Sequence, residues 1–250
     1  MIPIVNTKFD DVPENKLYKT VSNNFWFPIK EIEDAIVCYY NKNNMKSCLD
    51  IGADLYSFPI STEQINCKKC DKPTIVMDID TDIIPRPDNT YDFGYSRHTF
   101  EDIQNPDFAF KEFTRVCTEG YIETPSPLVE CMKGTDCITG NHRGYIHHRY
   151  IVWTDISDNS IHFLPKFPII EHLTFTEKFH NTMLVLANEY GTYWNNYYMW
   201  NKDRPPKCII YKHGINFFIQ KDYANLLVNA IYKTIEASNY FVQNFLENNK

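Results

Sequence analysis

Short apolar runs alternate with polar turns in the first half of the chain. Three of them have the length of buried parallel strands and end at a polar residue or a turn former: residues 47–52, 74–79 and 91–95. A helix is predicted next, because apolar residues recur at helical spacing over 108–117, with Asn105-Pro106-Asp107 as a start signal and Gly120 as a stop. Tyr121-Ile122 predicts a further strand. This order of elements favours an open α/β sheet.

Helical periodicity returns near both ends of the chain. Residues 26–40 predict a helix in which Pro28 suits the first turn and four apolar side chains share one face: Ile29, Ile32, Ile36 and Tyr39. Further helices are predicted at 179–190 and 223–246. The remaining patterns predict a hairpin and two short strands: 150–154 with 160–168, then 207–212 and 215–220. We expect the aromatic block at 193–200 in the core, although aromatic rings beside asparagines would also suit a sugar ring.

The length of 250 residues fits one domain with elaborations and a sizeable core. We expect an irregular N-terminal arm over residues 1–24 and an α/β core over 25–153. Residues 154–250 are then a C-terminal elaboration of the same domain, which we expect to determine substrate specificity.

The charge pattern narrows the range of partners. The formal net charge is −7 and no run of Lys or Arg exceeds two residues, which argues against nucleic acid as the main partner. The N-terminus lacks a basic segment followed by an apolar core, and nowhere do 18 apolar residues run together. We therefore predict a soluble, cytoplasmic protein without a membrane span.

The eight cysteines need not form disulfides in a chain that is not secreted. Cys67 and Cys70 form the only pair with metal-like spacing, and a zinc site would need a second pair. Cys131 and Cys137 are spaced too widely to supply it. We expect free thiols and no metal.

Polar residues end the predicted strands, where open sheets bind their ligands: Asp50, Asp78, Asp80, His98 and Glu123. They belong to an ordered series of motifs: Cys48-Leu-Asp-Ile-Gly52, Asp78-Ile-Asp80, Pro87-Asp-Asn-Thr-Tyr-Asp92, Ser96-Arg-His-Thr-Phe-Glu101, Asn105-Pro106, Glu112-Phe-Thr-Arg-Val116 and Gly120-Tyr-Ile-Glu-Thr-Pro-Ser126. A histidine-rich segment follows at 142–150. This series resembles the class I S-adenosylmethionine-dependent methyltransferases of methyltransferase type 11, and in particular a subgroup found in glycan and cell-surface sugar gene sets.

The resemblance implies a Rossmann-like fold, S-adenosyl-L-methionine as cofactor, and a sugar hydroxyl as methyl acceptor, on a nucleotide-sugar or a glycan end. The cofactor-binding residues that it implies are Asp50, Gly52, Ala53, Asp54, Asp78, Ile79, Asp80, Ser96, Arg97 and His98. Asp50 and Gly52 would shape the cofactor loop, Asp78 and Ile79 would hold the adenine, and 96–98 would border the methionine end.

Three departures from the family pattern stand out. The first loop keeps one glycine, Gly52, where the family is glycine-rich. Only 25 residues separate Gly52 from Asp78, too few for the usual two strands and a helix, so Glu63 or Asp71 would replace the acid that binds the ribose. Asp102 stands where the family commonly has a second histidine.

The catalytic base is expected among the histidines. Residues 140–150 hold three of the eight histidines and two of the six arginines, and imidazole is the natural base for a hydroxyl near neutral pH. We predict His148 as the base, with His98 and His147 as alternatives. His98 could instead cap the next turn.

Glu123 could take a proton or hold a backbone amide. Substrate contacts are expected from Glu101, Ser126, His142, Arg143 and Arg149. If 145–153 is a strand, alternate side chains face opposite sides, so His148 and Arg149 cannot point into one pocket. No carboxylate is spaced within this segment to complete a metal site of histidines.

Other functions stay open. The single glycine and the short ribose segment also fit a binding or scaffold protein that kept the fold and lost methyl transfer. Methylation of another small metabolite or of a lipid head group is a further alternative, and a homodimer is possible. Nineteen lysines against six arginines, with many asparagines, resemble the proteins of large DNA viruses, in which case the protein would act in the host cytoplasm.

Overall fold

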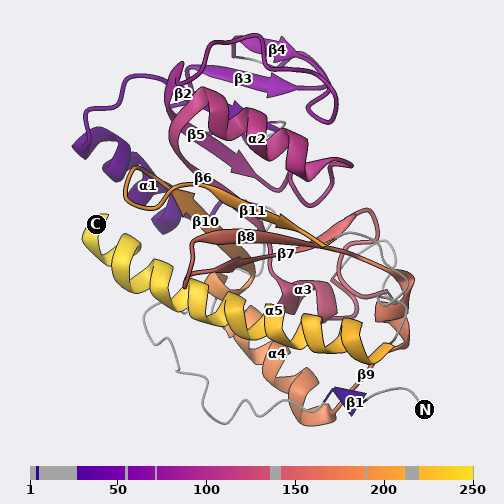
Figure 1. The fold of residues 1–250 in the computed structure, drawn as a ribbon. Coiled ribbons are helices and arrows are strands. Elements are labelled where there is room, and N and C mark those ends of the chain that lie inside the picture. The colour runs from indigo at the N-terminus through magenta and orange to yellow at the C-terminus, as the bar shows by residue number, and fades with distance from the viewer. Residues whose placement is uncertain are drawn as a thin grey trace.

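A central sheet of six strands organises the molecule (Figure 1). It is seen in a computed structural model that describes residues 4–5, 27–53, 56–70, 72–135, 142–189, 191–211 and 220–249. In spatial order the strands are β10 (Asn195–Trp200), β6 (Cys117–Pro125), β5 (Tyr91–Arg97), β2 (Cys48–Ile51), β3 (Glu63–Asn66) and β4 (Thr74–Val76). All pairs are parallel except β10 with β6. The predicted mostly parallel α/β sheet is confirmed.

The strand order reverses between β2 and β5. From β2 the chain adds β3 and β4 on one side, then crosses back to place β5 on the other side of β2 and β6 beyond it. Such a switch point leaves a crevice beyond the carboxyl ends of the two central strands.

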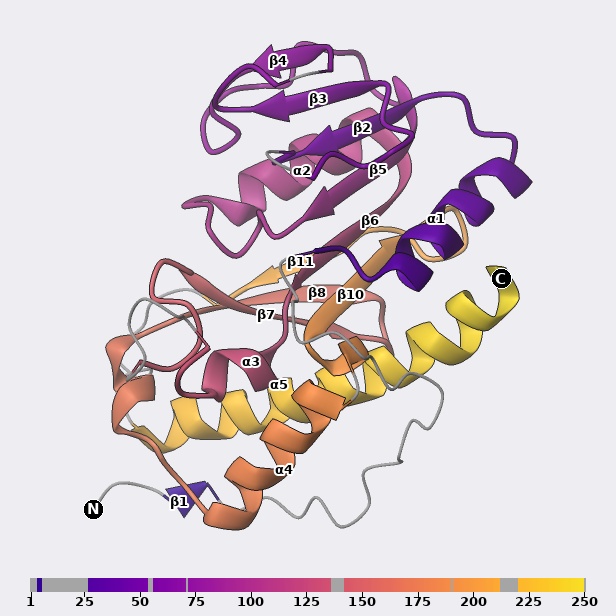
Figure 2. The same ribbon diagram turned by 180° about the vertical axis from the view of Figure 1, so that it is seen from behind.

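Helices α1 (Lys30–Lys42) and α2 (Pro106–Val116) cover opposite faces of this sheet (Figures 1 and 2). Ile36 of α1 packs in one apolar cluster with Cys48, whereas Phe113 of α2 packs in another with Leu49. Cys48 and Leu49 are neighbours on β2, so their side chains point to opposite faces. Both predicted helices are present, but the first begins at Lys30, so Pro28 precedes it and does not lie in its first turn. Along the described part of 56–90 no helix is present, so none covers β3 and β4 there.

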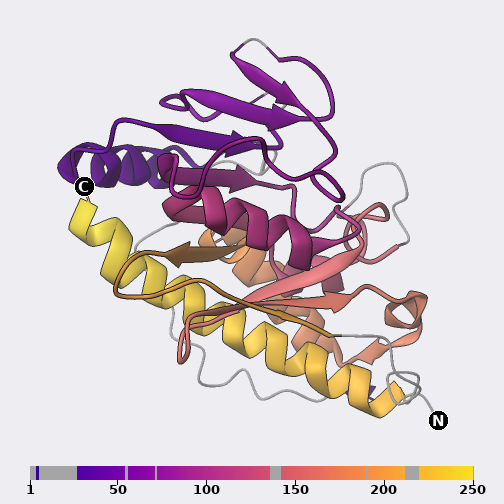
Figure 3. The same cartoon turned by 45° about the horizontal axis from the view of Figure 1, so that its top comes forward.

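A second sheet lies beside α2. The predicted hairpin is confirmed as β7 (Tyr150–Asp155) and β8 (Ser160–Pro165), and β11 (Lys207–Ile210) runs parallel to β8. β7 separates two cores, because Val152 packs in the cluster that holds Leu49, whereas Trp153 packs against α5 (Gln220–Phe241). Figure 3 shows α5 running along this sheet. A turn of π-helix, Val242–Leu246, continues α5.

In the described part of the chain, the remaining elements are two more helices, a pair of two-residue strands and three 3-10 turns. They are β1 (Ile4–Val5), which pairs with β9 (Thr174–Phe175), the helices α3 (Pro127–Cys131) and α4 (Glu177–Glu189), and the 3-10 turns Pro168–His172, Gly191–Tyr193 and Glu247–Asn249. α4 and α5 were predicted. Across the described residues, no helix is long and apolar enough to cross a membrane.

Several predicted boundaries are wrong. Gly120 does not end a helix; α2 ends at Val116 and Gly120 lies inside β6. β3 was not predicted as a strand, because its sequence Glu-Gln-Ile-Asn is mostly polar. The strand expected over 145–153 begins only at Tyr150, so the predicted alternation of His147, His148 and Arg149 does not apply. Residues 215–219 of the strand expected at 215–220 lie outside the described residues, and Gln220 begins α5. All of the N-terminal arm except Ile4–Val5 also lies outside them.

Two glycines face each other at the centre of the sheet. Gly94 of β5 is paired with Gly120 of β6, which is in turn paired with Trp200 of β10. A Cβ atom at Gly120 would lie 2.3 Å from the indole of Trp200 and 2.7 Å from the carbonyl oxygen of Gly94. The rings of the aromatic block are buried; Trp200 fills the space at Gly120, and Phe113 of α2 fills the space at Gly94.

Candidate active site

A cavity of about 400 Å³ opens at the switch point of the sheet. It lies at the carboxyl ends of β2, β3 and β5 and beyond β4, and its lining residues are Ile51, Gly52, Ile65, Asn66, Cys67, Met77, Asp78, Ile79, Asp80, His98, Thr99, Asp102 and Ile103. Five predicted residues therefore line one cavity: Gly52, Asp78, Ile79, Asp80 and His98. Tyr56 and Phe58 do not line it, and Phe58 is instead stacked on Tyr95 at 4.1 Å.

Gly52 shapes the floor of the cavity. Its φ of +80° is a left-handed conformation that glycine adopts without strain, and a Cβ atom there would lie 1.9 Å from Thr99 Oγ1. The Gly52 amide donates to the carbonyl of Ile65 on β3. One glycine is therefore required here by conformation and by space. Asp54, which was also predicted to bind the cofactor, lies outside the described residues.

The acidic turn after β4 is held by its own carboxylates. Asp78 Oδ1 accepts from the amide of Asp80 at 2.9 Å, and Asp82 Oδ2 accepts from the amide of Asp78 at 3.0 Å. Asp80 Oδ1 accepts from the amide of Asn105 at 2.6 Å, which ties this turn to the start of α2. Asp78 and Asp80 thus stand at fixed positions on the cavity wall.

Asn66 ends β3 at the cavity, where the family pattern has the ribose-binding acid. Its side-chain amide donates to the carbonyl of Ala53. Glu63, one candidate for that acid, lies at the amino end of β3 and is bound to Arg86 and Tyr91 at the opposite edge of the sheet. The role predicted for Glu63 is therefore wrong. Asp71, the other candidate, lies outside the described residues.

Four predicted cofactor residues do not line the cavity. Asp50 points to the α1 face and accepts from the amide of Phe58 at 2.7 Å, and burial raises its pKa to about 7. Ser96 is buried and donates to the carbonyl of Ile51. Ala53 is also buried, and Arg97 forms an ion pair with Glu123 at 2.8 Å. These four residues therefore do not belong to the lining of this cavity.

His98 stands at the tip of β5 with a left-handed φ of +51°. Its Nε2 lies 3.2 Å from Asn195 Oδ1, and Asn195 Nδ2 donates to Glu123 Oε1 at 2.7 Å. Because that amide is oriented by a carboxylate, its oxygen faces His98, so Nε2 carries the hydrogen and Nδ1 keeps its lone pair. Burial, and then the charge of Arg97, hold the pKa of His98 well below its usual value.

Glu123 is held by three neighbouring side chains. Its carboxylate accepts from Arg97, Tyr121 and Asn195, and its side chain is 2% exposed. Its backbone carbonyl accepts from the amide of His98 at 2.8 Å. These three bonds to the carboxylate all come from side chains and none from a backbone amide, so both roles expected for Glu123 stay predictions.

His148, which the sequence analysis predicts as the catalytic base, is buried and does not line this cavity. Its Nδ1 lies 2.7 Å from Glu130 Oε1, and Lys166 Nζ lies 2.5 Å from Glu130 Oε2. Burial opposes a charge on His148, but the bond to Glu130 and its negative charge outweigh burial and raise the pKa. A histidine that holds its proton is a poor base. His147 is half exposed and lies 3.9 Å from Asp102.

Glu101 is a buried carboxyl group without a partner. It is 1% exposed, and within the described structure neither carboxyl oxygen has a hydrogen-bond partner. Burial raises its pKa to about 8. His98 Nδ1 and His148 Nε2 lie 3.9 and 4.0 Å from its Oε1, so Glu101 stands between the two histidines.

The other predicted substrate residues are scattered. Ser126 is buried, caps α3 and donates to the carbonyl of Tyr193. Arg143 is buried and donates to the carbonyls of Cys131 and Leu173. Both side chains are therefore already hydrogen-bonded within the protein. His142 and Arg149 are exposed, and His142 lines a second cavity of about 260 Å³ with Arg143, His148 and Lys166.

Several residues of the site were not predicted. Asn66 was missed because β3 was missed, and Thr99 follows His98 without any pattern of its own. Glu130 contacts His148 from 18 residues before it, and Lys166 binds Glu130 from 36 residues after that, distances over which sequence spacing carries no signal. A buried acid in the short helix α3 looks like any surface acid until the chain is folded.

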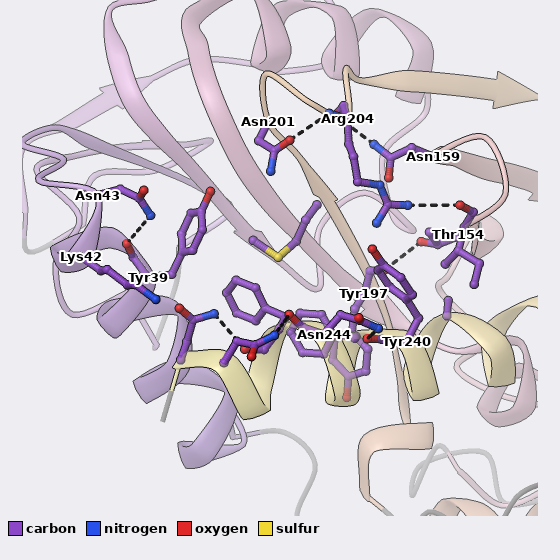
Figure 4. A pocket seen from close by; sticks show the side chains of 17 residues that line it. Tyr39, Lys42, Asn43, Thr154, Asn159, Tyr197, Asn201, Arg204, Tyr240 and Asn244 are labelled. Atoms are coloured by element: carbon purple, nitrogen blue, oxygen red, sulfur yellow. Dashed lines mark hydrogen bonds between the residues drawn. The ribbon is translucent and has the colours of Figure 1, made fainter.

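A further cavity of about 360 Å³ lies at the opposite edge of the sheet (Figure 4). It is formed between α1, the end of β10 and α5, and Tyr39, on its wall, donates to Glu119 near the amino end of β6 at 2.6 Å. The guanidinium of Arg204 lies 4.9 Å over the ring of Tyr240. None of the predicted site residues lines this cavity.

Residues 41–122, less than half of the chain, match the methyltransferase domain family. No curated protein matches the sequence. Among solved structures, an S-adenosylmethionine-dependent methyltransferase from Mesorhizobium loti is 12% identical over 34% of this chain and 50% of its own, with a TM-score of 0.29. The plantazolicin methyltransferase BpumL, solved with SAH, is 16% identical over 39% of this chain and 46% of its own, with a TM-score of 0.33.

An O-methyltransferase from a trans-AT PKS multienzyme of Brevibacillus brevis, in complex with S-adenosyl-L-homocysteine, is 16% identical over 38% of this chain and 40% of its own, with a TM-score of 0.29. This chain therefore spans half or less of the length of these three structures.

Proposed function

We propose that this chain is an S-adenosylmethionine-dependent O-methyltransferase that acts on a sugar hydroxyl with a histidine base. The observation that carries the proposal is the cavity at the switch point, bordered by an uncharged histidine and built by the segment that matches a methyltransferase domain. The cavity is within the size range of small-molecule sites.

The chemical groups that line the cavity suit those of S-adenosylmethionine. Gly52 lines the cavity, and its lack of a side chain leaves room for Thr99 on the same wall. Asp78, Asp80 and Asn66 bring side-chain oxygens to the side formed by β3 and the turn after β4, where ribose hydroxyls and the adenine amino group would find acceptors. His98 and Thr99 on the β5 side would border the methionine end.

His98 is the base in this proposal, in place of His148. It lines the cavity, its imidazole is neutral, and the bond from Nε2–H to Asn195 leaves Nδ1 to take a proton. His148 lines the other cavity and is held by Glu130. The hydrogen bonds from Asn195 to Glu123 and from His98 to Asn195 fix the imidazole ring of His98, much as an acid orients a histidine in other active sites.

When bound, S-adenosylmethionine would supply a methyl group activated by its sulfonium charge; the acceptor oxygen would bond to that carbon while the carbon–sulfur bond breaks and its electron pair stays on sulfur. The hydroxyl proton passes to Nδ1 of His98. The protein otherwise aligns the acceptor oxygen with the methyl group, which is where most of the rate gain from positioning arises.

The first test separates an enzyme from a scaffold. Calorimetry should show S-adenosylhomocysteine binding to the wild-type protein with a 1:1 stoichiometry. His98→Asn keeps a residue that tolerates a positive φ and should retain this binding while methyl transfer falls by about 10²–10⁴-fold, the usual share of a general base. His172→Ala, at an exposed histidine away from the cavity, is the matched control and should leave both unchanged.

Absence of binding heat at millimolar ligand would support a scaffold and sink the enzymatic proposal. The acceptor is tested separately, by transfer of a labelled methyl group to nucleotide-sugars, oligosaccharides, other hydroxylated metabolites and lipid head groups. Labelling of the last two alone would contradict the sugar acceptor and leave the methyl transfer standing.

A further inference from the structure

Three potential metal ligands meet beside the cavity. One atom each of Asp102, His147 and His148 lies within 4.8 Å of the others. His147 Nε2 is 3.9 Å from Asp102 Oδ2, and His148 Nε2 is 4.0 Å from Glu101 Oε1. The acids come from the turn after β5 and the histidines from the segment before β7, so the fold supplies the carboxylates that the histidine-rich segment lacks.

The acids of this cluster have buried oxygens that nothing satisfies. Asp102 Oδ1 and both carboxyl oxygens of Glu101 are buried without a hydrogen-bond partner in the described structure, and Glu101 is 1% exposed. An unpaired buried carboxyl group is costly, and such groups call for a ligand or an ion. Both unsatisfied side chains lie on the side where the histidines meet.

His148 is oriented as a metal-binding histidine is. Glu130 is an acceptor at 2.7 Å from Nδ1, so Nδ1 carries the hydrogen and the lone pair lies on Nε2, which faces the acids. A carboxylate behind the ring is the usual support of a ligating histidine. Lys166 holds that carboxylate in turn.

We propose that Asp102, His147, His148 and Glu101 bind one divalent transition-metal ion of the zinc class. Two imidazoles with carboxylates favour such an ion over magnesium or calcium, which prefer oxygen alone. Four ligands around zinc stand roughly 3.4 Å apart at the usual bond lengths, so the cluster must contract. His147 and Asp102 can move, because their side chains are 53% and 39% exposed.

A second cluster of potential metal ligands differs from the first, because its side chains are already hydrogen-bonded. Asp155, Asp158 and His162 also lie close together, but each already has protein partners. Asp155 accepts from Ser157, Asp158 from Lys207 and Ser160, and His162 bonds Ser160 and Tyr211. Its ligand atoms are satisfied, so it gives no reason for an ion.

The proposed ion would stand between two cavities. Asp102 lines the cofactor cavity and His148 lines the cavity of about 260 Å³ that Arg143 and Lys166 share. An ion there would bind acceptor oxygens next to the methyl donor and favour loss of the hydroxyl proton to His98. This role rests on the proposed function, whereas the binding of the ion does not.

Calorimetry on the full chain after chelator treatment tests the site with Zn²⁺ and Mg²⁺. We expect one Zn²⁺ per chain and weak or no Mg²⁺ binding. His147→Ala and Asp102→Asn should each weaken Zn²⁺ binding at least tenfold, while His172→Ala leaves it unchanged. Binding of S-adenosylhomocysteine by His147→Ala serves as the check that the fold and the cofactor site are intact.

Three results would overturn the proposal. The first is no Zn²⁺ binding by the wild-type chain, and the second is equal affinity in wild type and His147→Ala. The third is loss of the ion in Asp158→Asn or in a Cys67→Ser/Cys70→Ser variant, which would assign it elsewhere. A Co²⁺ spectrum without thiolate bands would support nitrogen and oxygen ligands.

Discussion

At the scale of single residues, the surroundings decide what a histidine can do. His98 and His148 both stand near Glu101, yet burial beside Arg97 lowers the pKa of His98, and the bond to Glu130 raises that of His148. The sequence ranks His148 first because it lies in the histidine-rich segment. Its partner Glu130 is distant in sequence, so the group that raises the pKa of His148 could not be identified from the sequence.

Asp50 gives a prediction that pH can test. Burial raises its pKa from about 3.9 in an unfolded chain to about 7, so the folded protein binds the extra proton. Its contribution to the free energy of unfolding is present in full below about pH 4 and is lost as the pH rises through about 7. Asp50→Asn should therefore lose less stability than wild type between pH 5 and pH 8.

Denaturant unfolding of both proteins at the two pH values measures that difference. Asp34→Asn, whose side chain is 60% exposed, is the control and should follow wild type. An Asp50→Asn variant with the pH dependence of wild type would show that this carboxyl group is ionised at neutral pH.

At the scale of elements, the two facing glycines of β5 and β6 fix how close the aromatic rings can come. A methyl group at Gly120 would collide with Trp200 and with the backbone of β5. We expect Gly120→Ala to lower the free energy of unfolding by about 1–3 kcal/mol, as overpacking does.

Trp200→Leu should relieve part of that cost, because the smaller side chain leaves room. A double-mutant cycle by denaturant unfolding measures the coupling. Strictly additive costs of the two substitutions would mean that the ring and the added methyl group do not meet.

Some strand ends of the candidate site could be predicted from the sequence, and one strand could not. Gly52, Asp78 and His98 follow apolar runs, so their place at strand ends could be predicted from pattern alone. β3 could not, because Gln64 is fully buried in a strand of mostly polar residues and only its pairing with β2 and β4 explains its conformation.

At the scale of the whole molecule, the segment that matches a methyltransferase domain shares its core with later elements. Leu49 of β2 packs in one cluster with Val152 of β7, and the next residue, Trp153, packs with Leu227 of α5. The two sheets therefore share the core cluster that holds Leu49 and Val152. The specificity elaboration predicted for 154–250 is thus also part of the core.

Because the cores are joined through β7, we expect one cooperative unfolding transition. Leu49→Ala and Leu227→Ala remove fully buried side chains and should each lower the stability of that same transition by about 2–5 kcal/mol. Tryptophan fluorescence and far-ultraviolet circular dichroism should give coincident curves. Two separate transitions, each shifted by only one variant, would show independent units.

The strands β3 and β4 help to form the ligand crevice although no helix of the described residues 56–70 and 72–90 packs on them. Within the described residues, the chain passes from β2 through β3 and β4 to β5 without a helix, yet Asn66 and the turn after β4 still reach the wall of the cavity. The ends of the strands and the turns that follow them build that wall. A crevice of this kind therefore requires no helix between β2 and β4.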